Sequence, residues 1–355
     1  MTAKTLSNDI EAQRQSFYEE LKPHNLAPLW EVLHGLVTPE PRTTAVPAKW
    51  SYAPARDYLL RAGDLISAEE AERRVLILEN PATLGQSRIT RTLYAGLQLI
   101  LPGEAAPVHR HTQSALRFVM QGSGAFTAVN GEHAVMQRFD LVLTPSLYWH
   151  DHGNATGEPM IWLDGLDIPL IQSLDASFAE GMGSKDASSV QAETKPPGDN
   201  IARYGRNMRP VANTTADITR GPQPLFHYPY AEWRSNLTAT ATASEPDPHF
   251  GVRMEFTNPA TAGPIMATMS AFAQLIPKAY ETRPVQSTDG AVYVVCEGTG
   301  RAHIGEEEFS LSESDIFVVP AWAKYHFHAD DELILFSYSD RSVQEKLNLW
   351  REARH

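Results

Sequence analysis

The run Arg117-Phe118-Val119-Met120-Gln121-Gly122-Ser123-Gly124 joins a short apolar segment to a turn that contains two glycines. A second run of the same kind, Val292-Tyr293-Val294-Val295-Cys296-Glu297-Gly298-Thr299-Gly300, lies in the C-terminal half of the chain. Short apolar runs that are punctuated by glycine turns are typical of antiparallel strands. The two runs therefore predict two related β regions, each of them an antiparallel sandwich or barrel.

The similarity extends to the segments on either side of these runs. Gln98-Leu99-Ile100-Leu101-Pro102 precedes the first run, and Gln274-Leu275-Ile276-Pro277 precedes the second. Asp140-Leu141-Val142-Leu143-Thr144-Pro145 follows the first run, and Asp315-Ile316-Phe317-Val318-Val319-Pro320 follows the second. One matching strand would carry little weight, because β domains share such features. Three blocks in the same order indicate a duplicated domain.

The composition changes outside the two β regions. Residues from about Asn8 to Leu36 carry apolar residues at helical spacing, with breaks expected at Pro23 and Pro28. A stretch rich in Gly, Ser and Pro predicts an exposed linker. The expected fold class is all-β with flanking helices. Its expected parts are an N-terminal helical segment (1–72), a first β domain (73–180), a linker (181–215), a second β domain (216–340) and a C-terminal helix (341–355).

The bulk composition excludes several classes of partner. The 355 residues are 42% hydrophobic, which allows a large core and roughly two domains at this length. The formal net charge of −13 argues against a nucleic-acid partner. Cys296 is the single cysteine, so an intrachain disulfide is impossible and a reducing compartment fits. We find no apolar run of signal-peptide or membrane-spanning type, and expect a cytoplasmic protein with no membrane partner.

Three histidines of the first β region form the strongest candidate site. His109 and His111 are two positions apart, and side chains at i and i+2 of a strand project from the same face. His150 follows 39 positions after His111. Three neutral imidazoles suit a divalent transition metal and leave coordination positions open. A lone His-x-His pair is often surface or core filler, so the prediction of a metal site depends on the motif around it.

The spacing of this motif resembles that of the cupin superfamily. A Gly-x5-His-x-His pattern ends at His111, and a Pro-x4-His-x3-Asn pattern runs from Pro145 to Asn154. Most cupins carry a glutamate ligand four or five residues after the second histidine, where this sequence has Ala115 and Leu116. The resemblance implies a bicupin, with two double-stranded β-helix (jelly-roll) barrels after the N-terminal helical segment. It also implies a metal site of three histidines without a carboxylate.

Longer strings resemble the gentisate 1,2-dioxygenases, and the match is densest between about residues 28 and 170. Salicylate and 1-hydroxy-2-naphthoate dioxygenases share much of the pattern, so the identity of the aromatic ring stays open among these three substrates. The strings are Pro28-Leu29-Trp30-Glu31-Val32-Leu33-His34, Tyr94-Ala95-Gly96-Leu97-Gln98, the run from His109 to Phe118, Trp149-His150-Asp151-His152-Gly153-Asn154, and Trp162-Leu163-Asp164-Gly165-Leu166-Asp167.

This resemblance implies an Fe(II)-dependent enzyme with one iron per subunit, in the N-terminal cupin. It implies ring cleavage of gentisate by O2 to maleylpyruvate, between the carbons that bear the carboxyl and hydroxyl groups, and a homotetramer. Zinc would fit three histidines equally well, so iron comes from the family alone. The family's metal ligands fall on His109, His111 and His150, its catalytic residues on His152 and Asp164, and its substrate-binding residues on Arg117, Arg73 and Gln98.

Each of the last five residues also has a plainer interpretation. A buried arginine needs an anion, and for Arg117 this could be the substrate carboxylate or a native acid such as Asp164. His152 could exchange a proton with the substrate, because an unperturbed histidine titrates near neutrality, or it could be a core histidine. Gln98 could be an ordinary strand residue, and Asp164 could be a turn residue of the Asp164-Gly165 pair. Arg73 is preferred to its neighbour Arg74 because it shares strand parity with Val75, although a solvated charge is the alternative.

The second β region lacks a comparable set of histidines. The counterpart of the His-x-His segment, Thr282–Thr288, contains no histidine, and His326 and His328 have no upstream partner. We therefore expect no complete metal site there. Three rival functions remain for the whole chain. They are another metal-dependent cupin enzyme such as an isomerase or decarboxylase, a non-catalytic bicupin that binds or stores a ligand, and a dioxygenase for salicylate or a hydroxynaphthoate.

Overall fold

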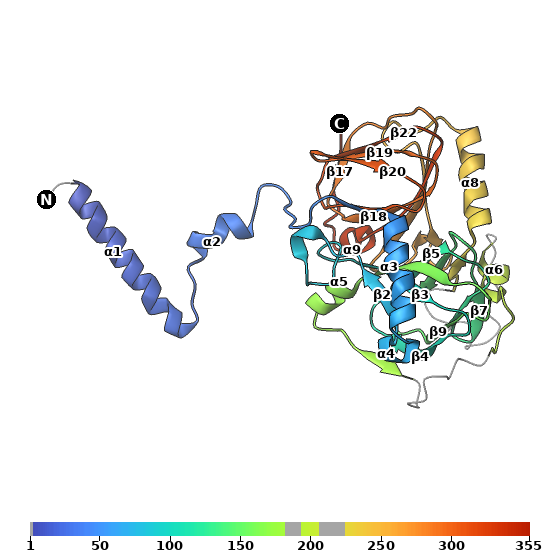
Figure 1. Ribbon diagram of the computed structural model, residues 1–355. Helices are drawn as coiled ribbons and strands as arrows, with labels where there is room; N and C mark the ends of the chain where they lie inside the picture. Colours follow the sequence, from blue (N-terminus) through green and yellow to red (C-terminus); the bar gives the residue numbers. More distant parts are fainter. Residues whose placement is uncertain (1–2, 182–192, 206–223) are drawn as a thin grey trace. The chain divides into compact units, whose positions relative to one another are not determined.

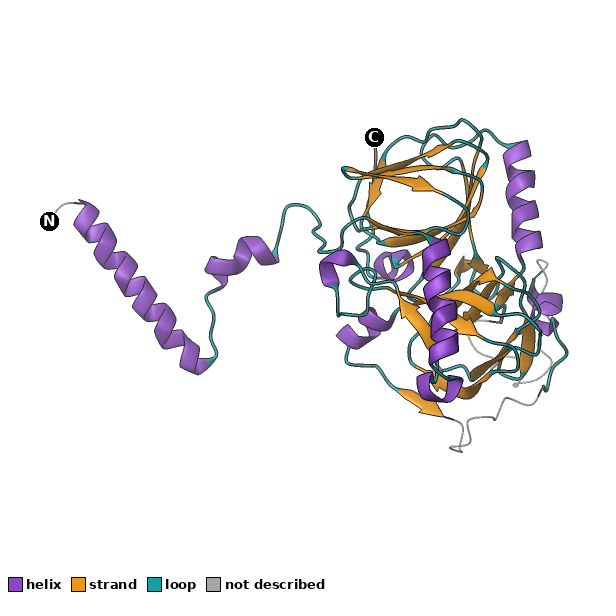
Figure 2. Cartoon of the chain, in the orientation of Figure 1, coloured by secondary structure: helices purple, strands orange, loops and turns teal. Residues whose placement is uncertain are grey.

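The computed structural model describes residues 3–181, 193–205 and 224–355 (Figure 1). The chain divides into a small N-terminal unit, up to Arg42, and a large unit from Thr43 to His355. Strands dominate the large unit, with a few helices among them (Figure 2), so the predicted all-β class with flanking helices is confirmed. Within the described residues no helix is long and apolar enough to cross a membrane.

The N-terminal unit is helical, with breaks where proline predicted them. Helix α1 (Ala3–Leu21) ends just before a 3-10 turn, η1 (Lys22–His24), that contains Pro23. Helix α2 (Leu29–Leu36) has Pro28 at its N-cap. The Tyr18 hydroxyl donates a hydrogen bond to Glu31 at 2.7 Å and accepts one from the Trp30 indole at 3.0 Å, which ties the two helices together.

Two similar halves make up the large unit. In the described part of the chain, each half contains one six-stranded and one five-stranded antiparallel sheet. The six-stranded sheet of the first half has the order β12 (His227–Tyr228), β8 (Leu141–Thr144), β5 (Ala115–Gln121), β10 (Met160–Leu166), β3 (Tyr94–Ile100) and β2 (Arg74–Ile77). Its five-stranded sheet has the order β11 (Ala179–Gly181), β4 (Ala105–His111), β9 (His150–Gly153), β6 (Phe126–Val129) and β7 (Glu132–Val135).

The second half repeats this arrangement, as the duplicated sequence blocks predicted. Its six-stranded sheet has the order β1 (Ala48–Trp50), β21 (Ile316–Val319), β18 (Ala291–Glu297), β23 (Leu333–Ser339), β16 (Ser270–Ile276) and β13 (Val252–Glu255). Its five-stranded sheet has the order β20 (Glu307–Leu311), β19 (Gly300–Ile304), β22 (Tyr325–Ala329), β17 (Val285–Ser287) and β24 (Glu352–Arg354). Strands β14 (Thr257–Asn258) and β15 (Gly263–Pro264) form a small hairpin. Both halves are open two-sheet sandwiches, as the resemblance to the cupins implied, but without the full closure that the word barrel implies.

Neither half is built from one continuous stretch of chain. Strand β1, which belongs to the predicted N-terminal segment, pairs with β21 of the second half. Strand β12, which follows the predicted linker, pairs with β8 of the first half. Each exchanged strand supplies backbone partners to a sheet edge that would otherwise be open. Among the residues that the structure describes, the helices of the large unit are α3 (Tyr52–Leu65), α4 (Ala68–Ala71), η2 (Pro81–Thr83), α5 (Ile168–Ser173), α6 (Asp199–Tyr204), α8 (Tyr230–Ala243) and α9 (Arg341–Lys346).

The expected C-terminal helix and the expected linker both need correction. The helix expected over 341–355 ends at Lys346, because the last residues form β24 and pair with β17. Much of the expected linker lies outside the described residues, but Asn200 within it is buried. Its backbone and side-chain nitrogens donate hydrogen bonds to Glu132 at 2.7 to 3.1 Å. This part of the segment is therefore anchored to the first half.

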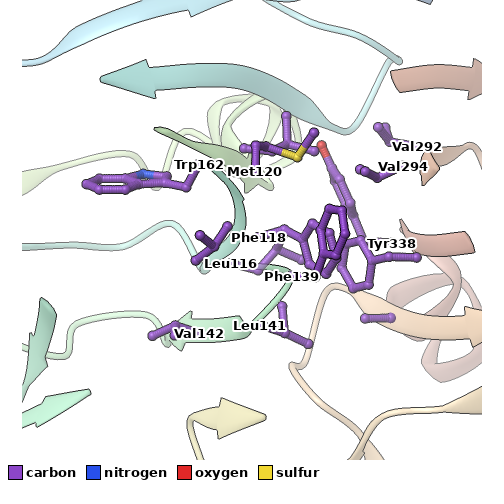
Figure 3. Close-up of a cluster of buried hydrophobic side chains, with 14 of the residues drawn as sticks. Leu116, Phe118, Met120, Phe139, Leu141, Val142, Trp162, Val292, Val294 and Tyr338 are labelled. Atoms are coloured by element: carbon purple, nitrogen blue, oxygen red, sulfur yellow. The ribbon is translucent and has the colours of Figure 1, made fainter. Parts of the chain in front are cut away.

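The two six-stranded sheets pack against each other through a shared core (Figure 3). The Phe118 and Phe336 rings stack with their centroids 4.0 Å apart, and the Tyr338 hydroxyl donates a hydrogen bond to the Tyr94 carbonyl at 2.9 Å. Side chains alternate along a strand, so Arg117 points away from this core, into the space between the two sheets of the first half. The shared core thereby sets the direction in which the polar residues of β5 and β10 face.

Candidate metal centre

The structure brings His109, His111 and His150 together inside the first half. His109 and His111 lie on β4, and His150 lies directly opposite His109 on β9. One ring nitrogen from each histidine lies within 4.8 Å of the other two. Antiparallel pairing explains the arrangement, because residues opposite each other on the same face have closely spaced side chains.

Each of the three rings is oriented by a backbone carbonyl. The Nδ1 atoms of His109, His111 and His150 lie 2.8, 2.8 and 2.9 Å from the carbonyl oxygens of Pro107, Gln113 and Tyr148, respectively. A carbonyl can only accept a hydrogen bond, so each ring carries its proton on Nδ1 and keeps a lone pair on Nε2. Nε2 of His150 is buried and has no hydrogen-bond partner. This donor set fits a divalent transition metal held by three neutral imidazoles.

The surroundings keep the three imidazoles neutral. Burial lowers the pKa of His109 to about 3 and that of His111 to about 4, with a smaller contribution from the nearby Arg73. Burial, together with the neighbouring His109 and Arg117, lowers the pKa of His150 well below 6.5. The rings are therefore neutral at neutral pH, each with one nitrogen free of a proton, as metal coordination requires.

Arg117 lies beside the histidines and is paired with Asp164. The two residues are directly opposite on β5 and β10, both are buried, and Arg117 Nε lies 3.5 Å from Asp164 Oδ1. Arg117 also donates a hydrogen bond to Thr144 Oγ1 at 3.0 Å. Burial lowers the pKa of Arg117 to about 10, so the guanidinium stays charged at neutral pH. The native ion pair considered as the plainer interpretation of Arg117 is therefore present.

The two candidate arginines point to different places. The Arg73 guanidinium contacts Nε2 of His109, and its charge interacts with Asp164. Arg74 is instead buried in an ion pair with Glu104 and donates to the Ile66 carbonyl at 2.8 Å. Arg73 therefore lies at the histidine cluster and Arg74 does not. Asp164 interacts with both Arg73 and Arg117, and the charge of Glu72 also acts on Arg73.

His152 also lies at the cluster, but its environment differs from the sequence expectation. Its ring centroid is 5.8 Å from that of His150 and 5.5 Å from that of Trp162, and Nδ1 lies 3.0 Å from Thr127 Oγ1. Nε2 is buried without a hydrogen-bond partner. We expected a pKa near neutrality, but burial lowers the pKa of His152 well below 6.5, with a further contribution from Arg117. The ring is therefore neutral at neutral pH.

Gln98 lies on the same sheet face as these residues. It is buried, and it sits on β3 opposite Val75 of β2 and Trp162 of β10. Because residues opposite each other share a face, Gln98 faces the same side as Trp162, whose ring contacts His152. All eight residues selected from the sequence therefore lie in or next to one cluster.

Two contributors were missed in the selection of site residues from the sequence. The Trp162 indole donates a hydrogen bond to Asp164 Oδ1 at 3.0 Å, which fixes the carboxylate that faces both arginines. Gly96 lies beneath the Tyr94 ring. A Cβ there would lie 2.7 Å from the Tyr94 hydroxyl oxygen and 2.6 Å from Val75 Cγ1. The i, i+2 spacing of Trp162 and Asp164 was a usable signal, whereas the close contact at Gly96 is visible only in three dimensions.

The second half holds no histidine at the corresponding positions. Strand β17 corresponds to β4 and β22 to β9, and Val285 pairs with Tyr325 where His109 pairs with His150. Tyr293 occupies the place of Arg117, and its ring stacks on Phe317 at 5.0 Å. His326 faces outward and stacks on His303 of the neighbouring strand at 4.4 Å. Among the described residues, only His109, His111 and His150 form a three-ligand group of this kind.

Removal of one ligand tests the centre. We expect the chain to bind one equivalent of Fe(II) or Co(II), and His111→Ala to reduce the bound metal to background, because two imidazoles hold a divalent ion far more weakly than three. Elemental analysis after anaerobic loading and desalting measures this. His303→Ala, which removes a histidine of the second half, should retain the full equivalent. Equal metal content in His111→Ala and wild type would contradict the assignment.

Comparison with known proteins agrees with this geometry. Residues 96–166 match the model of the cupin domain. The chain is 49% identical to gentisate 1,2 dioxygenase 1 of Aquipseudomonas alcaligenes over 98% of both chains. It is 35% identical to 5-aminosalicylate 1,2-dioxygenase of Comamonas sp, over 97% of this chain and 91% of that protein.

A solved structure is also closely similar. It is a tryptophan-to-tyrosine variant of the salicylate 1,2-dioxygenase of Pseudoaminobacter salicylatoxidans in complex with gentisate. It superposes with a TM-score of 0.88 at 31% identity and covers 97% of this chain and 95% of its own. The chain therefore belongs to the cupin family of gentisate 1,2-dioxygenases and their salicylate and hydroxynaphthoate relatives.

Proposed function

We propose that this chain cleaves the ring of gentisate with O2, between the carbons that bear the carboxyl and hydroxyl groups, to give maleylpyruvate. The observation that carries the proposal is a neutral three-histidine cluster with two arginines, Arg73 and Arg117, beside it. The membership of the gentisate 1,2-dioxygenase family supports the choice of ring. The alternative substrates are salicylate and 1-hydroxy-2-naphthoate, and the alternative of another class is a non-catalytic bicupin.

Fe(II), one ion per subunit, is the metal that we propose for His109, His111 and His150. When bound, it would supply adjacent open positions for the substrate's carboxylate and hydroxyl and for O2, and a path for electrons from ring to oxygen. The fit of the residues supports this, since one ring nitrogen from each histidine lies within 4.8 Å of the other two and each Nδ1 is turned to a backbone carbonyl. Iron rather than zinc is proposed because the family consists of dioxygenases.

The arginines of the cluster would bind the substrate's carboxylate. The chain as a whole carries a net charge of −13, which repels an anionic acid. Arg73 and Arg117 offset this locally, although the carboxylates of Asp164 and Glu72 interact with them. Arg117 is buried, so its charge-assisted hydrogen bonds would gain strength from the low dielectric around it, whereas Arg73 is exposed. We therefore propose that both arginines bind substrate and that Asp164 holds their guanidinium groups in place.

His152 and Gln98 would act on the substrate's hydroxyl side. If Nδ1 of His152 donates its proton to Thr127, Nε2 carries a lone pair that faces into the cluster. A neutral imidazole in this state can accept a hydrogen bond or a proton from a substrate hydroxyl. Gln98 would donate or accept a further hydrogen bond from the same face. These roles orient the ring and keep water from replacing the substrate's contacts.

We further propose that the subunits form a homotetramer. Helix α2 belongs to the N-terminal unit, and none of its residues, Leu29, Trp30 and Leu36 among them, is buried within that unit. Apolar residues that stay uncovered in their own unit usually mark an interface. The partners that we propose for the active site are a small aromatic acid and O2. The cytoplasmic location expected from the sequence stays a prediction.

Oxygen consumption by the iron-loaded chain tests the proposed reaction. After anaerobic loading with Fe(II), gentisate should drive O2 uptake in equal molar amounts, with the absorbance of the enol product rising in step. Salicylate run side by side should give little uptake. Equal rates with both acids, or salicylate alone, would favour the alternative substrates. Absence of uptake with all three aromatic acids, by protein that has bound its iron, would favour a non-catalytic bicupin.

Arg117→Lys tests the proposed binding of the carboxylate. Lysine keeps the charge but lacks the planar fork that contacts both Thr144 and Asp164. We expect KM for gentisate to rise about 10- to 100-fold, as loss of a charge-assisted hydrogen bond implies. Metal content should stay at the wild-type value. Arg138→Lys, which alters an arginine paired with Glu313 outside the cluster, is the control. An unchanged KM in Arg117→Lys would contradict this role.

A further inference from the structure

Two buried aspartates occupy equivalent positions in the two halves. Asp167 follows β10 and precedes α5, and Asp340 follows β23 and precedes α9. Oδ1 of Asp167 accepts a hydrogen bond from the backbone nitrogen of Ser114 at 2.9 Å. Oδ1 of Asp340 accepts one from the backbone nitrogen of Gly290 at 3.0 Å. Each aspartate therefore holds the residue just before the central strand of its own half, β5 or β18.

The second oxygen of each aspartate reaches into the other half. Oδ2 of Asp167 accepts a hydrogen bond from the Thr268 hydroxyl, two residues before β16. Oδ2 of Asp340 accepts one from the Thr92 hydroxyl at 2.9 Å, two residues before β3. Both aspartates are less than 5% exposed and both threonines are half-buried. We call these the Asp167 clasp and the Asp340 clasp, and they are related by the duplication of the chain.

The two clasps differ in what they hold. Ser114 directly follows Gln113, whose carbonyl oxygen accepts the Nδ1 proton of His111 at 2.8 Å. The corresponding residue of the second half is Asp289, whose side chain accepts a hydrogen bond from the Trp350 indole at 2.9 Å. Only the Asp167 clasp therefore adjoins a carbonyl that orients a histidine of the metal centre.

The other hydrogen bonds of the turn at residues 112–114 are made by Thr112 and Gln113, so Asp167 is the partner of Ser114. The Gln113 side chain donates to Ser177 Oγ at 2.6 Å, and the Thr112 nitrogen donates to the Phe178 carbonyl at 3.1 Å. Both partners lie in the segment before β11, on the outer side of β4. The Asp167 nitrogen returns a long hydrogen bond of 3.4 Å to the Ser114 carbonyl. The Asp167 carboxylate is thus the polar group that ties the end of this turn to the core.

We propose that Asp167 and Thr268 are positioning residues for His111, through the chain Thr268–Asp167–Ser114–Gln113–His111. The clasp fixes the Gln113 carbonyl, which in turn keeps Nε2 of His111 aimed at the point shared with His109 and His150. The second half, which holds no histidine at its own corresponding site, thereby contributes to metal binding in the first. This inference rests on the metal centre of the proposed function.

Titration with Co(II) alone compares the two clasps in the full-length chain. Asp167→Asn leaves one carboxamide oxygen for two donors, and we expect it to raise the Kd for Co(II) about 10-fold, the low end for partners that orient a ligand. The Co(II) visible absorption bands should shift as well, because the ligand field depends on the direction of His111. Asp340→Asn, the matched control, should change Kd less than about twofold and leave the bands unchanged, since its clasp is remote from the ligands.

Threonine variants perturb the clasps less than the aspartate variants do, so they test the same contacts with less risk of misfolding. Thr268→Val should raise Kd about threefold, below the effect of Asp167→Asn because Thr268 is one step further from the ligand, and Thr268→Ser should restore it. Thr92→Val removes the same hydroxyl from the Asp340 clasp and should leave Kd unchanged. Urea unfolding midpoints of all five variants show whether the two clasps contribute equally to stability.

Three results would overturn the inference in different ways. Equal Kd values and spectra for Asp167→Asn and Asp340→Asn would show that the Asp167 clasp does not position His111. A raised Kd for Co(II) in Asp167→Asn together with a wild-type Kd in Thr268→Val would show that the second half does not contribute to metal binding. Failure of the wild-type chain to bind Co(II) would contradict the metal centre itself, and with it the proposed function.

Discussion

The hydrogen bonds from three imidazole Nδ1 atoms to backbone carbonyls are the constraint on which the rest of this protein depends. They set the tautomer and direction of His109, His111 and His150 together, so that the Nε2 atoms meet inside the first half. The carbonyls belong to strands and turns of the sheets, so the fold itself supplies the precision of the site. A side-chain partner would add a rotamer of its own, whereas a backbone carbonyl in a paired strand has little freedom.

Burial and charge then decide what this site can bind. The low polarity around the cluster keeps the imidazoles neutral, which leaves a bound divalent metal with its full charge. Asp164 pairs with Arg117 and also interacts with Arg73, so two arginines lie beside the cluster in a chain that is acidic overall. On our proposal, a bidentate aromatic acid would satisfy both the metal and these arginines. The same half of the molecule would then combine oxygen chemistry with anion recognition.

The amino-acid sequence predicted the features that arise from local patterns. Repeated apolar runs with glycine turns predicted the two halves, and His-x-His spacing predicted ligands on one strand face. Features that depend on distant partners were not predictable in this way. Strands β1 and β12 pair with sheets far from them in sequence, and the C-terminal residues form β24 because β17 offers an edge. The low pKa of His152 likewise reflects its burial between sheets, which no local pattern reports.

X-ray absorption at the iron edge of the Fe(II)-loaded chain tests the central claim most directly. Our account predicts a first coordination shell of nitrogen and oxygen atoms in which three ligands show the outer-shell scattering of imidazole rings. Addition of gentisate without oxygen should leave those three imidazoles in place while the remaining oxygen ligands change. A shell with two imidazoles or fewer, or loss of an imidazole when gentisate binds, would contradict it.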